Sequence, residues 1–128
     1  MEYVDIIFSG VNKKDIDNLI KNKFNICRDK IIRSHFYTEE NGDFEYSDEI
    51  DLEKYFAGER TCNMFLSRLQ LNKIYSKVLI IITSDKADTD VTLNISADQF
   101  ESGDIELLRD YLKSSFSQYY VKHEFSDE

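Results

Sequence analysis

Three aspartates, Asp85, Asp88 and Asp90, are spaced loosely like the ligands of a calcium-binding loop. Carboxylate oxygens are the hard ligands that Ca²⁺ prefers. Two other features of that loop are missing, because Asp90 stands where the sharp turn needs glycine and Ser96 stands where the closing glutamate belongs. Asn94, on the next strand, does not replace them. We therefore expect a solvated hairpin loop here and no bound metal.

Histidine and cysteine are the other residues whose types could support catalysis. Asp48 could orient the imidazole of His35 across a hairpin, since a carboxylate fixes the tautomer and raises the pKa. No motif ties a nucleophile to this pair, so a structural cross-strand contact is expected. Cys27 has only Arg28 nearby to stabilise a thiolate, and Cys62 lies in an apolar stripe. Both cysteines are expected to be reduced, with Cys62 in the core.

No other catalytic pattern stands out. The four glycines are isolated, so no glycine-rich phosphate-binding loop exists. Acidic residues are numerous, yet nothing selects a pair for glycoside hydrolysis. The sequence thus predicts a protein that is not an enzyme and that binds no cofactor or metal.

The stretch YTEENGDFEYSDEIDLEK, residues 37–54, is the most unusual part of the chain. It holds eight carboxylates between Glu39 and Glu53 and no basic residue before Lys54. The net charge is -8 over residues 38–59, whereas residues 60–77 carry four basic groups and no acid. With -9 overall, the protein is repelled by phosphate backbones and anionic lipids, so direct binding to nucleic acid or membranes is disfavoured and a basic protein partner is favoured.

Length and patterning predict one α+β domain over residues 1–128, with the oligomeric state left open. No apolar run is long enough to span a bilayer, and acids near Met1 replace the basic region of a signal peptide, so we expect a cytosolic protein. A mostly antiparallel sheet of about five strands should carry helices in the order β-α-β-β-α-β-β-α. Strands are predicted at residues 2–8, 30–38, 77–83 and 91–95 and in the hairpin arm after Gly42. Helices are predicted at residues 12–24, 61–69 and 105–119, and a frayed tail is predicted at residues 120–128.

Asn41-Gly42 predicts a two-residue hairpin turn, because a type I′ turn needs positive φ at both positions. That register pairs Thr38 with Glu45 and His35 with Asp48. It gives the hairpin an aromatic inner face of His35, Tyr37, Phe44 and Tyr46 and an acidic outer face of Thr38, Glu40, Asp43 and Glu45. The apolar run Val78–Ile82 predicts a central strand that is buried on both sides.

The acidic stretch has two interpretations, a solubilising surface or a docking surface for a basic partner. Docking is favoured by the aromatic residues between the acids, since charges steer encounter and exposed rings act as hot spots. The predicted partner-binding residues are Glu39, Glu40, Asp43, Glu45, Tyr46, Asp48, Glu49, Asp51, Glu53, Tyr55 and Phe56.

The most acidic part of the chain is the stretch NGDFEYSDEIDLEKYF. The chain as a whole resembles small bacterial immunity proteins that neutralise polymorphic or contact-dependent toxins. The resemblance lies in size, acidity and element order. It implies tight binding to a cognate toxin, often a basic nuclease. Two alternatives stay open: a phage-encoded inhibitor of host defence whose carboxylates imitate DNA phosphates, and a small enzyme or ligand-binding regulatory domain.

The absence of a catalytic constellation generates the first testable prediction. His35→Ala and Cys62→Ala should each retain full biological activity as long as the variant is folded, because neither side chain belongs to a catalytic group. Activity is measured beside the thermal melting temperature. Lost activity in a variant with unchanged melting would favour the enzyme interpretation.

Overall fold

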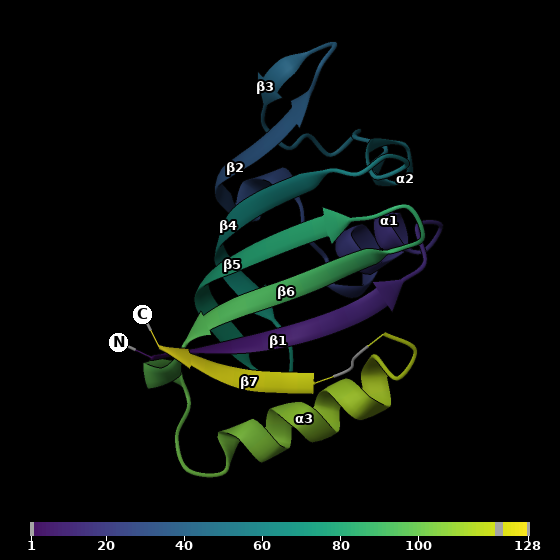
Figure 1. Cartoon of the computed structure of the whole chain (residues 1–128). Helices are drawn as coiled ribbons and strands as arrows, with labels where there is room; N and C mark the ends of the chain where they lie inside the picture. Colours follow the sequence, from purple (N-terminus) through teal and green to yellow (C-terminus); the bar gives the residue numbers. More distant parts are fainter. Residues whose placement is uncertain (1, 120–121, 128) are drawn as a thin grey trace.

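The computed structural model describes residues 2–119 and 122–127 and contains one antiparallel sheet (Figure 1). Its strand order is β3-β2-β4-β5-β6-β1-β7, and helical segments connect and flank the strands. The α+β class and the antiparallel sheet are as predicted, but the sheet formed by the described residues has seven strands where about five were expected. The elements are β1 (Glu2–Val11), α1 (Ile16–Asn18), the π-helical η1 (Leu19–Lys23), the 3-10 turn η2 (Arg28–Lys30), β2 (Ile31–Thr38), β3 (Gly42–Phe44), α2 (Leu52–Tyr55), β4 (Thr61–Gln70), β5 (Ile74–Ser84), β6 (Thr89–Ser96), the 3-10 turn η3 (Ala97–Gln99), α3 (Asp104–Ser115) and β7 (Lys122–Asp127).

Strand β5 lies at the centre of the sheet, between β4 and β6, as the apolar run predicted. Its side chains alternate in burial: Val78, Ile80 and Ile82 are fully buried, whereas Leu79 is half-buried and Ile81 is 37% exposed. The prediction of burial on both sides is therefore wrong. The short helical segments α1 and α2 lie behind the sheet in Figure 1, so they cover only one of its faces.

The predicted helix over residues 61–69 is wrong, because this segment forms strand β4. The residues Cys62, Leu66 and Leu69 fit a helical stripe, but Cys62, Met64 and Leu66 also alternate with a period of two. The strand pairs with β5 in a long antiparallel ladder, in which Met64 faces Ile80. Both periods are present in the sequence, and the long partner strand decides between them.

The hairpin exists, but its register differs from the predicted one. Thr38 pairs with Gly42 and Phe36 with Phe44, so residues 39–41 form the connection and only Gly42 has positive φ. Phe36 points into the core, where its ring stacks on that of Phe44 at 5.6 Å. His35 and Tyr37 consequently point outward. Thr38 pairs with Gly42 where Glu45 was predicted, a shift of three residues. Because the shift is odd, the even-numbered side chains of β2 share a face with Phe44.

The first helical segment is shorter than predicted, comprising α1 and η1, yet it buries the predicted face of Ile16, Leu19, Ile20 and Phe24.

The expectation of a frayed tail over residues 120–128 is corrected by β7, which pairs with β1. Residues 120, 121 and 128 lie outside the described residues. Within the described part of the chain, no helix is long and apolar enough to cross a membrane.

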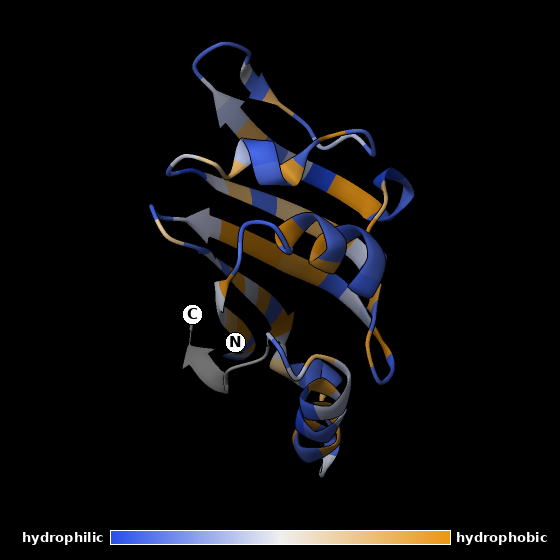
Figure 2. Cartoon of the chain, turned by 90° about the vertical axis from the view of Figure 1, so that its right-hand side faces the viewer, coloured by the Kyte–Doolittle hydropathy of each residue, from blue (hydrophilic) through white to orange (hydrophobic). Residues whose placement is uncertain are grey.

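Helix α3 closes one end of the core through an aromatic cluster. It buries Leu108 and Leu112, as its spacing predicted, and Phe116 follows directly after it. The Phe116 ring stacks on Phe24 at 5.2 Å and meets the edge of Phe8 at 6.0 Å. Three segments distant in the sequence are thus joined by one ring cluster. Figure 2 shows α3 apart from α1 and α2, next to the far edge of the sheet.

This cluster generates a prediction on stability. Phe24→Ala should lower the free energy of unfolding by about 3–5 kcal/mol, because it removes a 1% exposed ring from between two others. Urea denaturation measures the change. The control is Leu107→Ala on α3, whose side chain is 59% exposed and whose loss should change stability by less than about 0.5 kcal/mol. Equal effects of the two substitutions would contradict the assigned core.

Candidate partner interface

The acidic stretch forms a continuous part of the surface at the β3 end of the sheet. All eight of its carboxylate side chains are exposed, and they lie on the hairpin connection, β3, the following loop and α2. We call these residues, Glu39, Glu40, Asp43, Glu45, Asp48, Glu49, Asp51 and Glu53, the acidic block. Short elements and turns present them, because β3 has only three residues and α2 only four.

The three aspartates Asp43, Asp48 and Asp51 have structural partners. Asp43 accepts from His35 Nε2 at 2.8 Å, so the predicted pairing of His35 with Asp48 is wrong. Asp48 instead accepts from the backbone N–H of Arg28 at 2.8 Å, and Asp51 caps α2 by accepting from the N–H of Lys54 at 3.1 Å. The glutamate carboxylates of the block form no ion pair or hydrogen bond with the described residues. The glutamates are therefore free to meet a partner.

The rings expected to stay exposed in this stretch are core residues, and that expectation is wrong. Tyr46, Tyr55 and Phe56 are 2%, 6% and 0% exposed. The Tyr55 ring packs on its edge against Phe36 at 5.0 Å, and its hydroxyl accepts from the N–H of Tyr37 and donates to a backbone carbonyl. These rings support the acidic block from beneath. They offer no surface to a partner.

A shallow hollow of about 370 Å³ lies within the acidic block. Glu40 and Asp51 line it, together with the half-buried Phe44 and Ile50 and the side chain of Arg60. The guanidinium of Arg60 lies 5.5 Å from the Tyr55 ring centroid and donates to the Tyr37 carbonyl. The accessible apolar surface of the block is thus supplied by Phe44, which was predicted on the inner face of the hairpin, and by Ile50, which the sequence did not single out.

The residues considered for catalysis are placed apart. Cys62 is 1% exposed, and burial raises the pKa of its thiol well above the ordinary value, which opposes a nucleophilic thiolate. The carboxylate of Asp85 accepts from the N–H groups of Ala87 and Asp88, and these bonds hold its pKa below the usual range. Asn94 donates to Asp5. Among the described residues, no group of three or more His, Cys, Asp or Glu side chains is arranged to hold a metal ion.

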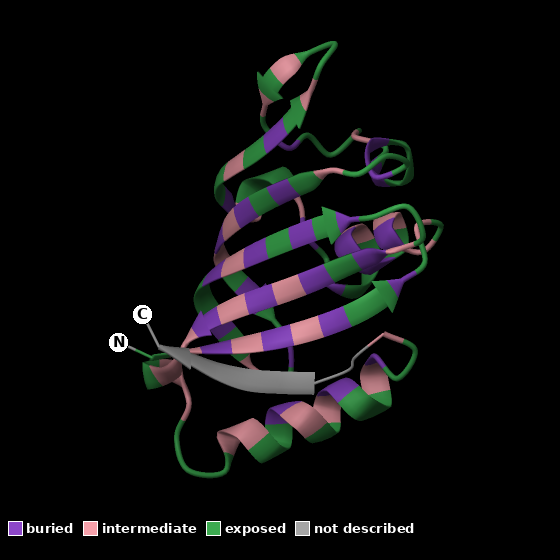
Figure 3. Cartoon of the chain, viewed as in Figure 1, coloured by how far each residue is buried: buried purple, intermediate pink, exposed green. Residues whose placement is uncertain are grey.

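The face of the sheet opposite α1 and α2 is a feature that sequence reasoning missed. Figure 3 shows buried side chains alternating with exposed and half-exposed ones along β5, β6 and β1. Phe65 of β4 and Leu79 of β5 are half-buried neighbours on this open face, beside Arg33 of β2. The alternation of Cys62, Met64 and Leu66 was the signal that could have revealed it.

With its acidic composition and one open sheet face, the described α+β fold is that of a small protein suited to binding a partner. The PABL017 Cdi1I immunity protein family matches residues 2–125, so the chain belongs to this family and is a toxin-neutralising immunity protein. No curated protein matches the sequence significantly. One chain in a crystal structure of the toxic C-terminal tip of CdiA from Pseudomonas aeruginosa in complex with an immune protein has a similar fold, with a TM-score of 0.64 and 16% identity, over 100% of this chain and 88% of that one.

The buried tyrosine beneath the acidic block generates a prediction on pH dependence. Burial, with Asp48 nearby, raises the pKa of Tyr46 to about 12 from 10.0. The folded state then holds this proton more tightly than the unfolded state, so its contribution to stability is complete below pH 10 and is lost as the pH rises toward 12. Tyr46→Phe should therefore flatten the fall of stability between pH 10 and pH 12.

Urea midpoints measured from pH 8 to pH 12 test this prediction. The matched control is Tyr37→Phe, which removes the same hydroxyl group from a side chain that is 49% exposed and so reports the effect of this substitution outside the core. Parallel curves for wild type and Tyr46→Phe would contradict the assignment.

Proposed function

We propose that the protein neutralises a basic toxin domain by direct, non-enzymatic binding, and that the acidic block is a main contact surface. The single observation that carries this proposal is the exposure of all eight carboxylates of the block, of which Glu40 and Asp51 line one hollow. Close acidic groups create a potential that attracts a basic surface and speeds its encounter. Phe44 and Ile50 add apolar contact inside the same region.

A nuclease is the toxin class that fits this surface best. An enzyme that cleaves nucleic acid needs basic residues to hold the phosphate backbone. Free glutamates on a neighbouring protein can pair with the same basic residues and exclude the substrate. An immunity protein that inhibits by covering the toxin's substrate-binding residues needs no catalytic group of its own. This agrees with the buried Cys62 and with the exposed His35, which is paired with Asp43.

Charge reversal of the acidic block tests the proposal. Glu40→Lys, Asp43→Lys and Glu45→Lys together should slow association with the toxin by roughly 10-fold or more at low salt and flatten its salt dependence. All three side chains are exposed, so the fold should persist. Stopped-flow association with the toxin domain encoded immediately upstream, at low and high salt, is the measurement.

The control is the triple reversal of Glu101, Glu106 and Asp110, which changes the net charge equally at exposed positions outside the block. Its smaller effect would locate the steering charge in the acidic block. If the block variant associates as fast as wild type at low salt, the block is only a solubilising surface, and the interface must be sought in the second acidic region between Asp85 and Glu106.

A further inference from the structure

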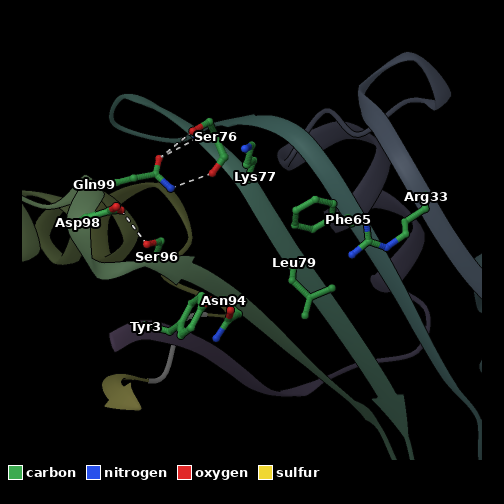
Figure 4. A pocket seen from close by; sticks show the side chains of 10 residues that line it. All are labelled: Tyr3, Arg33, Phe65, Ser76, Lys77, Leu79, Asn94, Ser96, Asp98 and Gln99. Atoms are coloured by element: carbon green, nitrogen blue, oxygen red, sulfur yellow. Dashed lines mark hydrogen bonds between the residues drawn. The ribbon is translucent and has the colours of Figure 1, made fainter. Parts of the chain in front are cut away.

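The open face of the sheet contains a hollow of about 720 Å³ toward the end where β6 leads into η3 (Figure 4). Neighbouring strands place Phe65 opposite Leu79, and Leu79 opposite Asn94, so the hollow has an apolar floor with a polar side. Tyr3 of β1 lines it as well. Phe65, Leu79 and Tyr3 are all only partly buried. Such accessible apolar surface, surrounded by polar groups, is typical of a protein-binding site.

Two cations line this hollow, although the protein as a whole is strongly acidic. They are Arg33 and Lys77, both exposed, and neither forms an ion pair with the described residues. The guanidinium of Arg33 lies over the Phe65 ring, 4.4 Å from its centroid, which holds the charge beside the apolar floor. Figure 4 shows both cations on the Phe65 side of the hollow.

Two carboxylates described on this face, Asp98 and Asp5, have partners within the protein. Asp98, which also lines the hollow, accepts from the Ser96 hydroxyl at 2.7 Å. Asp5 accepts from the side-chain amide of Asn94 at the same distance. These acids lie toward β6 and η3, away from Arg33. Among the described residues, neither cation on the Phe65 side of the hollow forms an ion pair with a carboxylate, so this side presents positive charge.

The backbone at Lys77 adds a second observation. Its φ of 53° lies in the left-handed region, which residues other than glycine, asparagine and aspartate rarely adopt. The β4–β5 register is the same on both sides of this residue, since Leu66 pairs with Val78 and Arg68 with Ser76, and Lys77 itself is not among the paired residues. Residues held in such conformations cluster at functional sites. A lysine at this position gives the hollow a charge that glycine would not supply.

We propose that the hollow is a second docking site for the toxin, and that it receives a toxin segment with an apolar side chain next to a carboxylate. This inference rests on the proposed function and assigns a further surface to it. The apolar side chain would rest on Phe65 and Leu79, while Arg33 and Lys77 pair with the carboxylate. Because the acidic block and the hollow have opposite charge, together they fix the orientation of the partner.

Binding of purified protein to the toxin domain encoded immediately upstream, measured by calorimetry, tests the apolar floor. Leu79→Thr should weaken binding by about tenfold or more, because it removes apolar contact while threonine still suits a strand. The matched control is Leu107→Thr on α3, an exposed leucine outside the hollow, which should bind like wild type. Equal affinity of Leu79→Thr and wild type would overturn the proposal.

A second variant tests the charge and does not depend on the packing of Leu79. Arg33→Gln combined with Lys77→Asn should weaken binding by about tenfold or more, and asparagine tolerates the left-handed backbone. Lys14→Gln, at an exposed site on the helical side, is its control. Unchanged or tighter binding by the double variant would overturn the acidic-partner assignment.

The outcomes also separate the two proposals. If wild type binds the toxin and both hollow variants bind equally well, the hollow is excluded while the proposed function stands. If the hollow variants lose affinity and the acidic-block variant does not, the hollow is supported and the acidic block is excluded as the main contact surface. If wild type does not bind this toxin domain, both proposals fall.

Discussion

Burial of one face of a single sheet is the constraint on which the rest of the structure depends. The inward side chains of β1, β4, β5 and β6 are almost all fully buried, and the helical segments cover them from one side. Burial of apolar surface is the main favourable contribution to folding, and here it is gained on one face only. The opposite face consequently keeps partly exposed side chains and can serve binding.

The acidic block is compatible with this core because its aromatic residues point inward. Tyr46, Tyr55 and Phe56 alternate with or follow the acids in sequence, yet in the fold they lie beneath them. The packing of Phe36 against Phe44 and Tyr55 holds the short hairpin on the sheet. Closely spaced carboxylates repel one another, so aromatic packing beneath them offsets part of that cost. A stable acidic surface thus needs the rings that the sequence places between its charges.

In the proposed binding mode, opposite charges on separate surfaces let this immunity protein recognise its toxin in one orientation. The acidic block lies on the hairpin and α2, whereas Arg33 and Lys77 lie on the open face of the sheet. A partner that satisfied one surface in the wrong orientation would meet like charge at the other. Specificity of this kind arises from repulsion in wrong arrangements as much as from attraction in the right one.

The sequence by itself determined the α+β class, the central position of β5, the buried face of the first helical segment and the stripe of α3. It also indicated the class of protein, which the family match confirmed. Each of these depended on a pattern with one physical interpretation, such as the apolar run Val78–Ile82. The acidic block was visible as well, and its role as an interface stays a prediction.

The tertiary structure decided the features for which local patterns were ambiguous. Residues 61–69 fit both a helical and a strand period, and only pairing with β5 made them a strand. The Asn41-Gly42 signal located the hairpin, but burial of Phe36 set its register and turned His35 and Tyr37 outward. The hollow between Arg33, Phe65 and Leu79 joins three strands, and strand order is absent from local sequence patterns. Its position became clear only once long-range pairing placed β2, β4 and β5 side by side.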